Sequence, residues 1–154
     1  GGVMSAAIIT RIAFRKTDVI QMLNGCIGGL VAITAEPLMP SPLAAILIGA
    51  VGGIIVVYGT KFLLSMKIDD VVGAIPAHLF AGIWGTLAVP ITNSGASFGT
   101  QLLGVVSINA FVFVVSFIIW FLMKSTFGIR LSKEGETKGT DVTETGVIAY
   151  AIRD

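Results

Sequence analysis

The chain has 154 residues, of which 55% are hydrophobic and 12% charged, and its formal net charge is +1. Ordinary soluble domains carry about twice that share of charged residues, and the mean hydropathy of +0.93 is correspondingly high. The composition therefore excludes an ordinary soluble domain. We expect an integral membrane protein in contact with the lipid bilayer and no nucleic-acid partner.

Apolar segments follow one another along most of the chain. Residues 43–64 and 101–123 are each long enough to cross a bilayer, for which about 20 apolar residues suffice. The pattern predicts an all-α, polytopic transmembrane helix bundle with about five spans. We place these spans at roughly 1–14, 19–36, 42–66, 70–91 and 98–124.

The two ends of the chain differ in character. The chain opens at Gly1 inside an apolar segment that lacks the features of a signal peptide. We expect this segment to be the end of a truncated span, and the chain to be a fragment of a longer protein. Residues 125–154 are polar and glycine-containing. We therefore predict a membrane domain over 1–124 and a cytoplasmic tail without a core of its own over 125–154.

Basic residues are confined to one side of the predicted membrane topology. They lie at the ends of the first, third and fifth spans or after them: Arg11, Arg15, Lys16, Lys61, Lys67, Lys124, Arg130, Lys133, Lys138 and Arg153. The connections on the other side carry Glu36 as their only charge. The positive-inside rule makes the basic side cytoplasmic. The C-terminus is then cytoplasmic, and Glu36 lies near the outer mouth as either a cation attractor or a solvated loop charge.

Side chains at the predicted helix starts agree with these boundaries. Asp18 can cap the second helix, and Ser41 with Pro42 places a cap and a first-turn proline at the third. Asp69 and Asp70 offer carboxylates to the N–H groups at the start of the fourth helix.

Small residues recur four apart in three of the predicted helices. This spacing lets helix backbones approach closely in lipid. The positions are Gly25 and Gly29 in the second helix, Gly49 and Gly53 in the third, and Gly73, Ala77, Ala81 and Gly85 in the fourth. We expect these faces to pack against neighbouring helices.

His78, the only histidine, follows Ala74 by one turn on the adjoining face of the fourth helix. An ionisable group at membrane depth is costly and is most often functional. Two interpretations remain open: a neighbouring helix satisfies the imidazole, or His78 lines a path and bonds a small solute. Pro76 removes one backbone hydrogen bond, so we expect a loosened helix there. No pattern indicates an enzyme, a metal site or a cofactor.

The segment from Lys67 to Thr86, with Asp69, Asp70 and His78 at characteristic spacing, resembles the tenth transmembrane helix of the ammonium transporter family (Amt/Mep/Rh). Residues 24–35 look like the eighth helix of that family and 45–53 like the start of the ninth. In the tail, 128–132, 139–144 and Ala149-Tyr150 resemble the C-terminal region of the family.

The resemblance implies that the chain is the C-terminal portion of an eleven-helix transporter fold, helices seven to eleven plus tail. It implies ammonium or ammonia as substrate, a homotrimer in the plasma (inner) membrane, and a PII-type signalling protein as a candidate partner at the cytoplasmic face. His78 matches the second of two pore histidines, and Ala74 matches a pore-facing position. Asp69 and Asp70 match an acidic pair that we interpret as structural.

Two positions depart from the common pattern of the family. Glu36-Pro37 follows Ala35 where a small or apolar residue is expected, and Thr145-Gly146-Val147 replaces the usual His-Gly-Glu. The second departure bears on regulation by the tail more than on transport. Some relatives of the family act as ammonium sensors, so a sensor or regulatory membrane module is the alternative function.

Overall fold

The computed structural model describes residues 1–149, and Tyr150 of the tail motif and Arg153 of the basic set lie outside the described residues. Within 1–149 the regular elements are all helical, which confirms the predicted all-α class. They are α1 (Gly2–Phe14), α2 (Val19–Ile33), α3 (Pro42–Ser65), η1 (Ile75–Phe80), α4 (Ala81–Thr92), α5 (Phe98–Thr126), α6 (Lys133–Lys138) and η2 (Asp141–Thr145).

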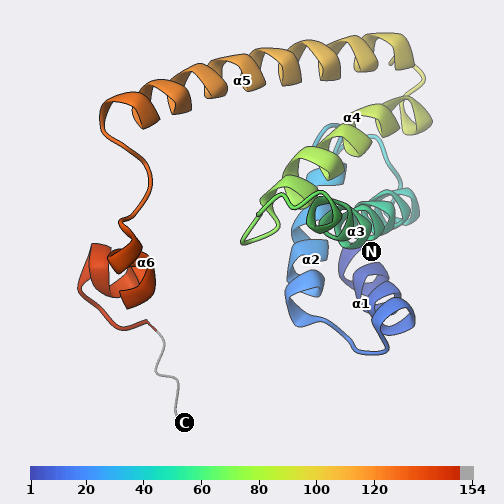
Figure 1. The fold of residues 1–154 in the computed structure, drawn as a ribbon. Coiled ribbons are helices and arrows are strands. Elements are labelled where there is room, and N and C mark those ends of the chain that lie inside the picture. The colour runs from blue at the N-terminus through green and yellow to red at the C-terminus, as the bar shows by residue number, and fades with distance from the viewer. Residues whose placement is uncertain (150–154) are drawn as a thin grey trace. The chain divides into compact units, whose positions relative to one another are not determined.

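The chain divides into two compact units. The first unit, Gly1–Ile108, holds α1 to α4 and the start of α5, and the second begins at Asn109. Figure 1 shows α1, α2 and α3 side by side with the η1–α4 helix beside them. The domain boundary that we place at residue 124 stays a prediction.

Within residues 1–149, three helical stretches are long and apolar enough to cross a membrane: α3, the continuous η1–α4 helix, and α5. The apolar helices α1 and α2 are shorter, at 13 and 15 residues. The second predicted span extends to residue 36, but α2 ends at Ile33. The Thr34 hydroxyl donates to the Val31 carbonyl at 2.7 Å, and Pro37 cannot continue a helical ladder.

The predicted caps of the second and third helices are confirmed. The Asp18 carboxylate accepts a hydrogen bond from the Gln21 N–H at 3.0 Å. The Ser41 hydroxyl accepts one from the Ala44 N–H at 3.3 Å, and Pro42 occupies the first turn of α3. Both caps satisfy N–H groups that a helix start leaves without a partner.

Glycines make the contacts between α1, α2 and α3, as their four-residue spacing predicts. A Cβ at Gly25 would lie 2.6 Å from the Ala6 Cβ, and one at Gly29 would lie 3.0 Å from the Gly2 Cα. A Cβ at Gly53 would overlap the Gly2 carbonyl oxygen. These distances leave no room for a side chain, so the glycines allow the backbones of the three helices to touch.

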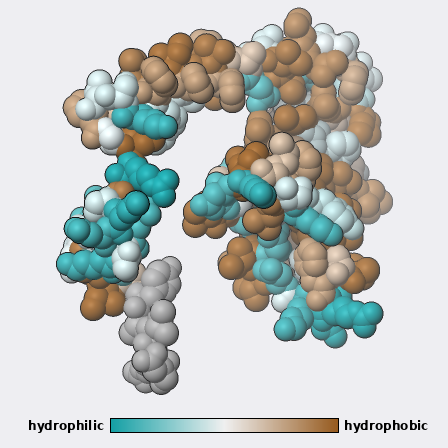
Figure 2. Space-filling model, viewed as in Figure 1, coloured by the Kyte–Doolittle hydropathy of each residue, from teal (hydrophilic) through white to brown (hydrophobic). Residues whose placement is uncertain are grey.

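Large apolar side chains cover much of the surface of the first unit. Figure 2 shows hydrophobic residues over its helices and hydrophilic ones near the α1–α2 connection. The exposed set includes Met4, Ile12, Leu30, Leu43, Leu64 and Val72. The buried hydrophobic residues are mainly small, such as Ala6, Ala32, Ala77, Ala81 and Ala88. Apolar surface outside and small residues inside are what helices in lipid require, and with the apolar spans this marks an integral membrane protein.

The second unit forms local structure after α5. Ser132 caps α6 by accepting from the Gly135 N–H at 3.1 Å, and Arg130 pairs with Glu136 at 2.8 Å. The Asp141 carboxylate accepts from the Ala149 N–H at 2.8 Å. This bond, together with the Val142 N–H, lowers the pKa of Asp141 from its ordinary value. Polar contacts thus shape the tail, and Gly135 is the one buried residue between 125 and 149.

Candidate functional site

A tight turn leads into the helix that carries His78. The Gly73 N–H donates to the Asp70 carbonyl at 3.2 Å, and Gly73 has a φ of +74°. This left-handed conformation favours glycine because a Cβ would approach the following carbonyl oxygen. The turn sets the direction in which the helix leaves it.

One of the two acidic residues caps this helix. The Asp70 carboxylate accepts from the Ala74 N–H at 2.9 Å and from the Ile75 N–H at 2.8 Å. Asp69 is exposed, and within residues 1–149 its side chain has no hydrogen-bond partner. The predicted start of the helix at residue 70 is wrong, because residues 70–73 form the turn and regular helix begins at Ala74 and Ile75.

The first turns of this helix are wider than an α-helix. Residues Ile75–Phe80 form a π-helix, in which the Ala81 N–H donates to the Pro76 carbonyl five residues back. The sequence predicts a loosened helix at Pro76, and the widened turns are found there. Pro76 lies in the first turn, however, where its missing N–H removes no ladder bond. Pro76 and Phe80 pack on Gly59 of α3, where a Cβ would lie 3.1 Å from the Pro76 Cβ and 2.8 Å from the Phe80 ring. Such π-helical turns occur frequently at functional sites.

The stripe of small residues faces the other helices. Gly73, Ala77, Ala81 and Gly85 are all buried. A Cβ at Gly85 would overlap the backbone of Ala32, so α4 touches α2 directly at this point. The stripe therefore packs η1 and α4 against the bundle.

His78 and Ala74 lie on the open face beside the stripe. Both are exposed, and Gly82 on the same face is partly exposed. Among the described residues the imidazole has no hydrogen-bond or ion-pair partner. Within residues 1–149, therefore, no neighbouring helix supplies the hydrogen-bond partner that the first interpretation of His78 requires. Asp70 differs from His78 because its carboxylate binds backbone N–H groups at the start of the helix.

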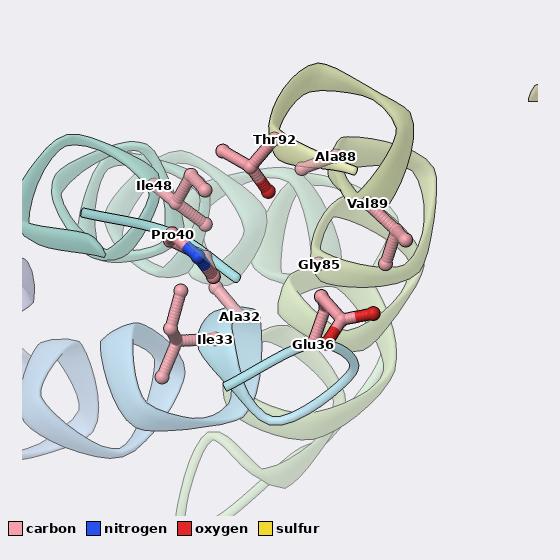
Figure 3. Close-up of a pocket in the computed structure, with 9 residues that line it drawn as sticks. All are labelled: Ala32, Ile33, Glu36, Pro40, Ile48, Gly85, Ala88, Val89 and Thr92. Atoms are coloured by element: carbon pink, nitrogen blue, oxygen red, sulfur yellow. The ribbon is translucent and has the colours of Figure 1, made fainter. Parts of the chain in front are cut away.

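A small cavity lies at the opposite end of α4, where α2 ends. Its volume is about 10 Å³, on the scale of a single water molecule. Figure 3 shows its lining, Ala32, Ile33, Glu36, Pro40, Ile48, Gly85, Ala88, Val89 and Thr92. The Thr92 hydroxyl points into this space and has no hydrogen-bond partner among the described residues.

Glu36 joins the two connections on this side of the bundle. Its carboxylate accepts from the Asn93 side-chain amide at 2.9 Å and the residue is half-buried. Glu36 is therefore a partly buried loop charge with one hydrogen-bond partner, and whether it attracts cations stays a prediction. The pairing escaped sequence analysis because the two residues are 57 positions apart.

Asn24 makes a long-range hydrogen bond for which no role is predicted from the sequence. It is 8% exposed on α2, and its side-chain amide donates to the Val72 carbonyl at 2.8 Å. An amide side chain in a largely apolar helix is itself a signal of an interhelical bond. Within residues 1–149, no three His, Cys, Asp or Glu side chains come together as metal ligands would.

Comparison with known proteins gives a consistent result. The sequence profile described as the Ammonium Transporter Family matches residues 1–150. Ammonium transporter Amt2 of Archaeoglobus fulgidus is 34% identical over 97% of this chain, which spans 36% of that protein. A putative ammonium transporter of Synechocystis is 40% identical over 86% of this chain, which spans 30% of it. The chain thus has about one third of the length of these relatives.

A solved structure described as a Sensor Amt Protein has the same arrangement of helices. Its TM-score is 0.86 at 29% sequence identity, over 94% of this chain and 38% of that one.

Proposed function

This chain belongs to the Ammonium Transporter Family, and from that premise we propose that it forms one wall of a pore that carries ammonium across a membrane as ammonia. The observation that carries the proposal is the exposed imidazole of His78 on an otherwise apolar helix, with Ala74 one turn away on the same open face. Because Ala74 is small and lies one turn before His78, it leaves space beside the imidazole for a solute of the size of ammonia.

The chemistry follows from the cost of moving charge into an apolar passage. Burial of an isolated ion costs on the order of tens of kcal/mol in a medium of low dielectric constant. Ammonium avoids this cost by releasing a proton to water at the outer mouth and crossing as neutral ammonia. The imidazole of His78 then offers ammonia a hydrogen bond inside the pore. Potassium has no proton to release, so the same passage excludes it.

The pore needs groups that this chain does not contain. In the proposed pore a second histidine, which the family resemblance implies on a helix outside these 154 residues, faces His78. Transporters built from two halves place their sites where the halves meet. We further propose a homotrimer in the plasma membrane with a cytoplasmic C-terminus. A PII-type signalling protein is its candidate partner at the cytoplasmic face.

Methylammonium uptake by the full-length protein tests this proposal. His78→Ala should lower the uptake rate at least about tenfold, because the hydrogen bond inside the pore is lost. Leu79→Ala, at the neighbouring exposed position, is the matched control and should transport normally. Unchanged rate and selectivity in His78→Ala would make His78 a packing residue.

A sensor is the second candidate function, and the solved structure described as a Sensor Amt Protein favours it. The same fold then binds ammonium and signals without transporting it. Ammonium binding without methylammonium uptake or ammonium-induced current in the full-length protein would establish the sensor and contradict the transporter.

A further inference from the structure

Asn24 ties α2 to the turn that precedes the His78 helix. It is 8% exposed, and its Nδ2 donates to the Val72 carbonyl at 2.8 Å across 48 residues of sequence. A buried amide left without a partner is costly. The bond therefore holds the turn firmly against α2.

The turn is held from both sides. A Cβ at Gly73 would lie 2.5 Å from the Asn24 Nδ2, so the amide rests directly against the Gly73 backbone. On the helix side, the Asp70 carboxylate holds the N–H groups of Ala74 and Ile75. Asn24 and Asp70 thus fix the three residues between Asp70 and Ala74.

The bonds that Asn24 and Asp70 make to the turn affect the position of His78 through the helix backbone. The Gly73 carbonyl, next in the chain to the bonded Val72, accepts from the Ala77 N–H at 3.2 Å. His78 follows Ala77 directly. A slip of the helix register by one residue would rotate every side chain by about 100° around the helix axis. The imidazole would then leave the open face that it shares with Ala74.

We propose that Asn24 is a positioning residue for the transport site, whose amide sets the rotation of the η1 helix and so the direction of the His78 imidazole. This inference rests on the proposed function of His78. Asn24 itself touches no solute in this account. A bond that merely stabilised the bundle would leave selectivity and pH dependence unchanged, and this difference is what an experiment can detect.

The experiment compares Asn24→Leu with Trp84→Phe in the full-length protein. Trp84 is a matched control because its Nε1 donates to the Ile48 carbonyl of α3 at 3.0 Å, a comparable bond from a side chain to a backbone carbonyl of another element, made from the middle of the η1–α4 helix. We expect Asn24→Leu to lower methylammonium uptake per folded trimer on the order of tenfold, since small displacements in a site are costly. Trp84→Phe should lose as much thermal stability as Asn24→Leu but should keep its methylammonium uptake.

Asn24→Asp provides a rescue that depends on pH. When protonated, the aspartic acid has the shape of asparagine and its O–H can donate to the Val72 carbonyl, whereas the carboxylate can only accept. The uptake of Asn24→Asp relative to wild type should therefore rise as the pH falls, and that of Asn24→Leu should stay flat. A ratio for Asn24→Asp that stays as low as that of Asn24→Leu at every pH would overturn the proposal.

A double variant separates this inference from the proposed function. In a His78→Gln background, Asn24→Leu should cause no further change in selectivity, because both changes act through one side chain. Full additivity, or equal uptake in Asn24→Leu and Trp84→Phe, would overturn the positioning role. A His78→Ala variant with normal transport would overturn the proposed function itself, whatever Asn24 does.

Discussion

Asp69 and Asp70 are adjacent acids with the same charge, and the structure gives them different roles. Asp70 caps two N–H groups at 2.9 and 2.8 Å, whereas Asp69 is exposed and its side chain has no hydrogen-bond partner within residues 1–149. Asp70→Ala should therefore destabilise the full-length protein, and Asp69→Ala should have little effect. The pair forms its own control, because each variant removes one negative charge from the same turn.

The expected size follows from the two bonds. One N-terminal cap contributes about 1 kcal/mol to stability, and a carboxylate near the positive end of the helix dipole adds roughly 0.3–1 kcal/mol. Asp70 makes two such bonds from a half-buried position, so we expect Asp70→Ala to lose about 2–3 kcal/mol. Asp69→Ala should stay within about 0.5 kcal/mol, as exposed substitutions usually do.

Thermal unfolding of the purified protein in detergent measures the difference. Asp70→Asn should lie between wild type and Asp70→Ala, because its amide oxygen can still accept one of the two bonds. Equal losses of stability in Asp69→Ala and Asp70→Ala would contradict the capping role of Asp70. The loss of one negative charge, which the two variants share, would then matter more than the cap.

Two further predictions follow from the packing of α4 and from the tail. Gly85→Ala should destabilise the protein by about 1–3 kcal/mol in the same unfolding assay, because a Cβ there overlaps the Ala32 backbone. Gly82→Ala, where the Cβ would lie 3.6 Å from a Val31 methyl group, should be neutral or stabilising, and an equal loss in both would contradict the packing. In the tail, the folded-state pKa of Asp141 is lowered, so its contribution to stability is present above its ordinary value of 3.8 and is lost as the pH falls through the folded value. The amide chemical shift of Ala149 should follow this titration in the full-length protein and lose it in Asp141→Asn; a shift that persists in the variant would assign it to another group.

Local sequence patterns predict those features that depend on residues close together in the chain. The caps by Asp18 and Ser41 are of this kind, since each joins residues three apart. The packing of Gly25 and Gly29 is another, because four-residue spacing on one helix suffices to mark a face.

The start of the His78 helix could not be predicted in the same way. Asp69, Asp70 and the apolar residues after them read as a helix that begins at the acids. The structure instead begins it at Ala74 and Ile75, because Gly73 adopts a left-handed conformation and Asn24 binds the turn from another helix. The Glu36–Asn93 pair depends likewise on a contact between distant segments. In each case the deciding partner is distant in sequence.

The central claim is that His78 lies on the path of the solute. The most direct measurement compares ammonium-induced current or flux with potassium flux through the full-length protein and its His78→Ala variant in the same membranes. We expect ammonium transport with potassium excluded in wild type, and a reduced ammonium rate or a lowered ammonium-to-potassium ratio in the variant. Identical ammonium rate and identical exclusion of potassium in the two proteins would contradict this claim.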